Sequence, residues 1–137
     1  MTTDPSVLRS LAVSAEDLLA AVEADARGGP RTVLRVTPPF SGRMRARLHV
    51  VRDETDSATL HVPPAAFLDD DAPPYPTPDE TADELRSADD ATYSVDRHRE
   101  YHEQRLDDWR ETVLDHVTDT VTPPALDRDI DVSVLGP

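Results

Sequence analysis

The chain has 137 residues, the length of one ordinary domain, and carries 28 acidic against 14 basic residues, for a formal net charge of −14. It contains no cysteine, which excludes a disulfide framework, a thiolate nucleophile and a cysteine-ligated metal. No apolar run approaches the ~18 residues that a membrane span requires. The N-terminus has no basic signal region, so we expect a cytoplasmic protein with no membrane partner.

All of the basic residues are arginine, and lysine is absent. Such a composition covers the surface with hydrated carboxylates, whose mutual repulsion costs little when salt screens it. The composition resembles that of cytosolic proteins from extreme haloarchaea, and the chain resembles the small uncharacterised proteins of those organisms. This resemblance implies a halophilic cytoplasm and implies no activity.

The first predicted elements are helical. Ser14 can cap a helix that ends before the Gly-Gly-Pro sequence at residues 28–30. Its apolar face would consist of Ala15, Leu18, Val22 and Ala26. Asp4 and Pro5 favour a short preceding helix over residues 5–12.

Three alternating strands are predicted next, over residues 32–36, 44–50 and 58–62. A hairpin loop around Phe40 would join the first two strands, with Arg35 opposite Arg45 and Arg31 opposite His49. The second and third strands would then pair with Leu48 opposite Leu60 and Val50 opposite Ala58. This register places every apolar side chain on one face.

Residues 63–92 are rich in proline and aspartate and are predicted to form a solvated connection with one short helix from Thr77 to about Arg86. A long amphipathic helix is predicted over residues 94–120, followed by a strand over residues 130–134. We therefore expect one α+β domain over residues 1–137. Its mostly antiparallel four-stranded sheet would carry the N-terminal helix and the long C-terminal helix on one face.

Residues 27–52 contain seven arginines and no acidic residue, in a chain that is otherwise strongly acidic. Strand alternation and the expected pairing place one set of side chains on a shared outer face, with Phe40 at the loop tip available for stacking. We call this predicted surface the basic face. Its members would be Arg31, Arg35, Phe40, Arg43, Arg45, Arg47, His49 and His61.

The basic face has two interpretations. The chain's own acidic residues, a protein partner or a second copy of the chain could pair with it. Alternatively, an arginine-bearing sheet face with an aromatic residue suits single-stranded nucleic acid. High salt weakens phosphate binding, which favours the first interpretation.

His98 and His102 are spaced so that two imidazoles could share a metal ion, but no third ligand of matching spacing is evident. Both residues also continue the apolar stripe of the long helix, where structural histidine is usual. The glycines form no phosphate-binding motif, and no serine sits in a nucleophile elbow. We therefore predict no metal, no cofactor and no catalytic residue.

The sequence leaves the function unknown and favours a non-enzymatic binding or adaptor protein, with a protein partner or homodimer. Two alternatives stay open. One is single-stranded nucleic-acid binding through the basic face. The other is an enzyme whose site lies between His49, His61 and the loop at residues 63–76.

Overall fold

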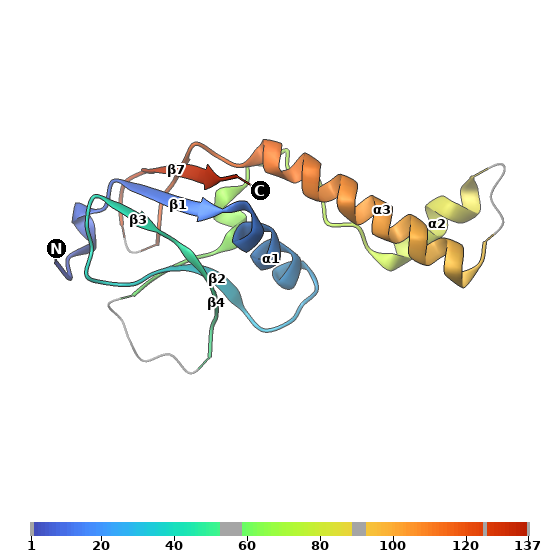
Figure 1. The fold of residues 1–137 in the computed structure, drawn as a ribbon, viewed down its shortest axis with the longest axis horizontal. Helices are drawn as coiled ribbons and strands as arrows, with labels where there is room; N and C mark the ends of the chain where they lie inside the picture. Colours follow the sequence, from blue (N-terminus) through green and yellow to red (C-terminus); the bar gives the residue numbers. More distant parts are fainter. Residues whose placement is uncertain (1, 53–58, 89–92, 125, 137) are drawn as a thin grey trace. The chain divides into compact units, whose positions relative to one another are not determined.

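The structure is a computed structural model that describes residues 2–52, 59–88, 93–124 and 126–136. Its contacts divide the chain into two compact units, and each is described by itself. The sheet unit comprises residues 1–70 and 117–137, and the helical unit comprises residues 71–116. The α+β class is confirmed, with the strands gathered in one unit and the two later helices in the other (Figure 1).

A mixed four-stranded sheet with the order β3-β1-β7-β6 forms the first layer of the sheet unit. Its strands are β1 (Ser10–Ser14), β3 (Arg43–Arg45), β6 (Thr120–Val121) and β7 (Ile130–Leu135). The central strand β1 runs parallel to both β3 and β7, and β6 is antiparallel to β7. The sheet therefore joins segments from the beginning, the middle and the end of the chain.

A second, antiparallel sheet has the order β4-β2-β5. It consists of β2 (Thr32–Val36), β4 (Arg47–Val50) and β5 (Leu60–Val62). Leu60 lies opposite Val36 of β2, so the expected pairing of Leu60 with Leu48 is wrong. The other half of that expectation, Val50 opposite Ala58, lies outside the described residues.

The chain passes from one sheet to the other at Ala46, so the structure has two sheets where we predicted one. The predicted strand over residues 44–50 is interrupted at Ala46, whose N–H donates to the carbonyl of Ala12 in β1 at 2.9 Å. Ala46 is fully buried, and the chain leaves the four-stranded sheet there and enters the three-stranded one. Strands that change sheets at such a bend are a common way to close a two-sheet core. The expected single, mostly antiparallel sheet is therefore corrected to one mixed and one antiparallel sheet.

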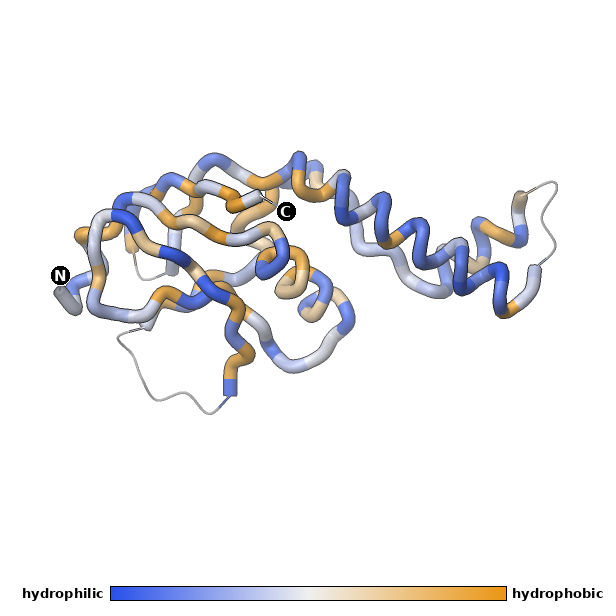
Figure 2. The backbone as a smooth tube through the Cα atoms, in the orientation of Figure 1, coloured by the Kyte–Doolittle hydropathy of each residue, from blue (hydrophilic) through white to orange (hydrophobic). Residues whose placement is uncertain are grey.

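The core of the sheet unit is apolar. Leu11 and Val13 of β1 pack in one cluster with Leu34 and Val36 of β2. The same cluster holds Leu8, Leu18, Ala21, Phe40, Ala46, Leu60, Val62, Phe67, Val121, Leu126 and Ile130. Both phenylalanines of the chain are fully buried, which gives the unit its two largest core side chains. Figure 2 shows the matching hydrophobic segments along the strands of this unit.

The segment before the first long helix is only partly helical. Asp4 accepts a hydrogen bond from the N–H of Ser6 and caps a 3₁₀ turn, η1 (Pro5–Val7). Residues 10–12, which we expected in a helix, begin the central strand β1. The side chains of β1 alternate between half-buried and buried, and long-range pairing with β3 and β7 outweighs the local helix preference.

The first long helix, α1 (Ala15–Ala26), follows the sequence prediction closely. The Ser14 hydroxyl accepts from the N–H of Asp17 at 3.0 Å, as expected of an N-cap. The helix packs on β2, on β4 and on the 3₁₀ turn η2 (Pro64–Phe67), and its buried residues are Ala15, Leu18 and Ala21. Ala26, at the exposed end, does not join that face.

The helical unit consists of α2 (Pro78–Ser87), α3 (Val95–Val113) and the 3₁₀ turn η3 (Leu114–His116). Thr77 caps α2 and Ser94 caps α3. The expected long helix is shorter than residues 94–120, and it packs against α2 in its own unit. Its expected packing on the sheet involves both units and stays a prediction. None of the described helices is long and apolar enough to cross a membrane.

Polar contacts make up much of the interface between α2 and α3. The fully buried hydroxyl of Thr81 lies 2.9 Å from His98 Nε2 and 2.9 Å from His102 Nδ1. The Glu84 carboxylate accepts from Arg105 Nε at 2.9 Å and from the Tyr101 hydroxyl at 2.6 Å. These bonds hold the pKa of Glu84 below its usual range and raise the pKa of Tyr101.

Candidate anion-binding site

The three-stranded sheet gathers several predicted site residues on one face. Arg47, Arg35 and His61 form one row across the three strands, because Arg35 of β2 lies opposite both of the others. His49 lies opposite Val33, two residues along β2 and on the same face. The rings of His49 and His61 approach to 5.5 Å between centroids, which confirms that these two histidines are neighbours beside Arg47.

The register of this face differs from the prediction by two residues. Arg35 lies opposite Arg47 where we expected Arg45, and His49 lies opposite Val33 where we expected Arg31. An even shift keeps every side chain on its predicted face. Arg35, Arg47, His49 and His61 therefore share a face, as predicted, although the register differs. Arg31 is exposed and lies just before β2.

Arg43 and Arg45 belong to the other sheet, in strand β3, and both are exposed. The bend at Ala46 nevertheless brings Arg45 next to the arginines of the three-stranded sheet. Arg35, Arg45 and Arg47 line one open depression of about 270 Å³ together with Thr37 and Met44. We call this depression the arginine pocket. Arginines from three strands and one threonine hydroxyl thus converge on the same space.

The arginines of this surface differ from the others in their partners. Arg31, Arg35, Arg43, Arg45 and Arg47 form no ion pair with any described carboxylate of the sheet unit, in residues 2–52, 59–70, 117–124 and 126–136. Arg27, by contrast, pairs with Glu23 at 3.6 Å on α1. Of the acidic residues near the basic face in sequence, Asp53, Glu54 and Asp56 lie outside the described residues, and Asp69 and Asp70 are exposed and form no ion pair with these five arginines.

Phe40 does not belong to the site. We expected this aromatic ring at a loop tip, open to stacking, but it has no exposed surface and packs in the core of the sheet unit. Its backbone forms an antiparallel bridge with Thr2 near the N-terminus, which draws the loop over the core. With so few aromatic residues in the chain, burying this ring stabilises the core more than exposing it would.

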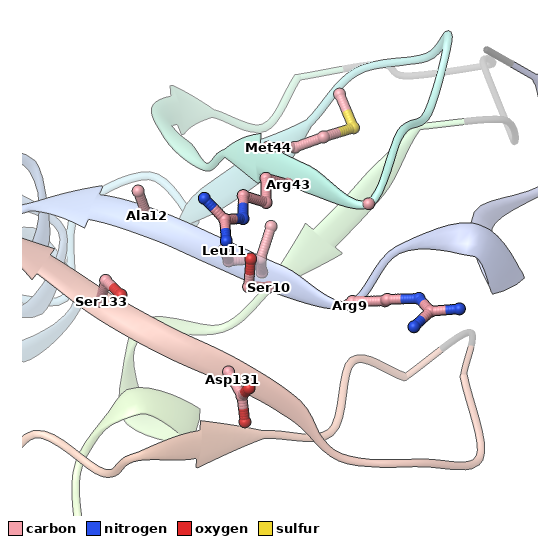
Figure 3. Close-up of a pocket in the computed structure, with 9 residues that line it drawn as sticks. Arg9, Ser10, Leu11, Ala12, Arg43, Met44, Asp131 and Ser133 are labelled. Carbon is pink, nitrogen blue, oxygen red and sulfur yellow. The ribbon is translucent and has the colours of Figure 1, made fainter.

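A second, larger depression lies on the outer face of the four-stranded sheet (Figure 3). It has a volume of about 660 Å³, and we call it the serine depression. Its floor consists of Ser10, Ala12 and Ser133, with Arg43 on β3 at one side and Asp131 on β7 at the other. Met44 lines both depressions, so the two adjoin.

Ser10, Asp131 and Ser133 line the serine depression but were not predicted as site residues. The signal was present, because small or polar residues alternate with Leu11 and Val13 in the segment that became β1. Alternation predicts the two faces of a strand but not which strand will lie beside it. Only the pairing of β1 with β3 and β7 brings Arg43 and Asp131 to the same surface.

The histidines do not assemble a larger site. His98 and His102 both contact the Thr81 hydroxyl inside the helical unit. In the strand pairing, His49 lies opposite Val33 and His61 lies opposite Arg35. Among the residues that the structure describes, no group of three or more histidine and acidic side chains could hold a metal ion.

Comparison with known proteins adds a family and no activity. Neither a curated protein nor a solved structure matches the chain. A family model described as a domain of unknown function (DUF8009) matches residues 1–136. Since the match spans both units, the chain belongs to this family of domains of unknown function, DUF8009.

Proposed function

We propose that this protein is a non-enzymatic binding protein and that its arginine pocket holds the phosphate backbone of a single-stranded nucleic acid. One observation carries the proposal. Arg35, Arg45 and Arg47 converge on one open depression, and no described carboxylate of the sheet unit forms an ion pair with them. Uncompensated cations from three strands cost electrostatic self-repulsion, which an anionic ligand would relieve.

The composition of the pocket favours phosphate as the anion. Each guanidinium presents a planar fork of donors that matches two phosphate oxygens, and the Thr37 hydroxyl offers a further donor. A pocket of about 270 Å³ accommodates a phosphate group with its ribose and is open on one side, as a polymer requires. The exposed positions of Arg45 and Arg47 allow both side chains to reach a bound strand.

The arrangement along the chain favours an extended polymer over a compact ion. Arg43 and Arg45 point to the same side of β3 and stand about 6.6 Å apart along the strand. The arginine pocket also continues into the serine depression through Met44. Successive cations along a sheet face fit successive phosphates of one extended strand. Because Phe40 is buried, stacking on this ring makes no contribution.

The first test is fluorescence anisotropy of labelled single-stranded RNA and DNA over a series of KCl concentrations up to 2 M. The variant Arg45→Ser/Arg47→Ser removes two pocket arginines. The variant Arg97→Ser/Arg99→Ser removes two exposed arginines of α3 and is its charge-matched control. We expect the pocket variant to lose most binding and to flatten the salt dependence of log affinity by about 1.4, since each phosphate contact on a single strand contributes about 0.7.

Two results would contradict the proposal. The wild-type protein could fail to bind either polymer at every salt concentration in which it is folded. Alternatively, the two variants could lose affinity equally, which would mean that the overall charge and not the pocket attracts the nucleic acid.

A second copy of the chain is the other candidate partner. Fourteen of the 28 carboxylates but only five of the 14 arginines lie in residues 71–116, so the helical unit has a net charge of −9. This acidic surface complements the arginine-rich segment of another molecule. Sedimentation velocity tests the idea: a dimer that dissociates in Arg45→Ser/Arg47→Ser and persists in the control variant supports it, and a wild-type monomer contradicts it.

A further inference from the structure

Two arginines and one carboxylate, Arg9, Arg43 and Asp131, line the serine depression, and Arg43 and Asp131 lie on either side of a row of small side chains. Ser10 of β1 lies opposite Arg43 of β3 on one side and opposite Asp131 of β7 on the other. The next row on the same face holds Arg45, Ala12 and Ser133. Figure 3 shows Arg43 extending from β3 toward β1, with Asp131 on the neighbouring strand β7.

The two charges are held apart. Two strand spacings of about 4.8 Å separate the backbones of Arg43 and Asp131 by roughly 10 Å. Neither side chain forms an ion pair with a described residue of the sheet unit, and both are exposed. A ligand that spans the depression could therefore meet a cation at one end and a carboxylate at the other.

The floor between these charges can receive a flat group. Ser10 and Ala12 are half-buried and Ser133 is exposed, and none of the three side chains extends far from the sheet. The depression is larger than the arginine pocket, about 660 Å³ against about 270 Å³. A planar ring could lie against the sheet there, with the two serine hydroxyls as hydrogen-bond partners.

Asp131 determines which ring fits. A carboxylate only accepts hydrogen bonds, and it repels the phosphates that the neighbouring arginines attract. If a strand lies across this face, Asp131 can only meet the donor edge of a base. Guanine presents two adjacent N–H donors, N1–H and N2–H, which match both carboxylate oxygens, whereas adenine and cytosine present one amino group and uracil one imino group.

We propose that the serine depression is a nucleobase subsite that selects guanine. Asp131 accepts N1–H and N2–H of the base, and Arg43 holds an adjoining phosphate. This inference rests on the proposed function, because it requires a single strand on the arginine surface. It adds a sequence preference that the arginine pocket alone would not supply, since phosphate contacts position a strand without reading its bases.

The test compares labelled uridine 12-mers that carry one central guanine, adenine, cytosine or inosine, by anisotropy with the full chain. We expect guanine to improve affinity roughly tenfold over adenine or cytosine, within the range of one bidentate base contact. Inosine lacks the N2 amino group and should lose most of this gain. The uridine oligomer without a guanine measures the base-independent binding.

Asp131→Ala should abolish the guanine preference and leave the affinity for plain oligouridine unchanged or slightly higher, since one negative charge is removed. Asp127→Ala, an equally exposed aspartate of the sheet unit, is the charge-matched control and should keep the preference. Equal affinity of the wild-type protein for all four oligomers, or a guanine preference that persists in Asp131→Ala, would overturn the inference alone. Absence of binding to every oligomer would overturn the proposed function together with it.

Discussion

Arginine has different roles in the two units of this protein. In the helical unit, Arg86, Arg99, Arg105 and Arg110 each form an ion pair with a carboxylate of α2 or α3. In the sheet unit, Arg31, Arg35, Arg43, Arg45 and Arg47 form no such pair with a described carboxylate of that unit. The same residue type therefore stabilises helices in one unit and is left accessible in the other. Arginines of this chain therefore differ in their pairing, and the set without an ion pair to a described carboxylate of its own unit is the one that we propose binds an anion.

The interiors of the two units differ as well. The sheet unit has an apolar core, whereas the helical unit places Thr81, His98 and His102 at its helix interface. Its largest buried side chain is Trp109, which donates from Nε1 to the Pro73 carbonyl at 2.9 Å and contacts the Tyr75 ring edge-on. Figure 2 shows how hydrophilic α3 is along most of its length. We therefore expect the helical unit to be the less stable of the two.

Lowering the salt concentration should produce the largest difference in stability between the two units. The helical unit carries a net charge of −9 and the rest of the chain −5. Below about 1 M KCl the Debye length exceeds ~3 Å and carboxylate repulsion is no longer screened. We predict that the helical unit unfolds first, which the single tryptophan, Trp109, reports by fluorescence. Hydrogen exchange of the backbone amides in β1 and β2 reports the unfolding of the sheet unit. Tryptophan fluorescence and amide exchange that both stay unchanged down to 0.1 M KCl would contradict the prediction.

Removing the largest core side chain of each unit should test whether the units unfold independently. Trp109→Ala should cost about 3–5 kcal/mol of stability in the helical unit, and Phe40→Ala a similar amount in the sheet unit. Circular dichroism follows α2 and α3, and amide exchange follows β1 and β2. Trp109→Phe serves as the control, because it keeps most of the packing and loses only the bond to Pro73, worth about 1 kcal/mol. Equal loss of protection in both units from either alanine variant would show that they unfold together.

Thr81→Val should have an intermediate effect that is confined to the helical unit. Valine keeps the shape of threonine but leaves the ring nitrogens of His98 and His102 facing a methyl group, which should cost about 1–3 kcal/mol. Thermal unfolding monitored by Trp109 fluorescence measures the loss. Thr112→Val, at an exposed position of α3, should change stability by less than about 0.5 kcal/mol. The polar interface would be unimportant if the two variants melted at the same temperature.

Glu84→Gln should have the smallest effect and a distinct pH dependence. Arg105 and Tyr101 lower the pKa of Glu84, so the carboxylate contributes stability above the ordinary glutamate pKa of about 4.3 and loses it as pH falls through the lower folded value. The glutamine variant should lack this acid-dependent loss, and at neutral pH it should be less stable by at most about 1 kcal/mol because the pair is partly exposed. Urea titrations between pH 3 and pH 7, with Glu103→Gln as the control, measure the difference. Parallel pH profiles for the wild-type protein and Glu84→Gln would refute it.

Local patterns predicted much of this structure. The N-cap Ser14, the capping Thr77, the alternating segments that became β2 and β7, and the amphipathic α3 were all identified from spacing alone. Helix caps and hydrophobic periodicity depend on neighbours within a few residues, so a single sequence contains them. His49 and His61 were also predicted to be neighbours, but from a direct pairing of their strands that does not occur, because β2 lies between β4 and β5.

The sequence by itself determined the charge segregation, the alternation of Arg43, Arg45 and Arg47, and the positions of most helices and strands. Only the tertiary structure decided that β1 is a central strand, that Ala46 divides the arginines between two sheets, and that Phe40 is buried. It also placed Arg43 and Asp131 on either side of β1, in the flanking strands β3 and β7. The physical reason is that strand partners and core positions are selected by contacts between distant segments, and the burial energy of those contacts outweighs local preference.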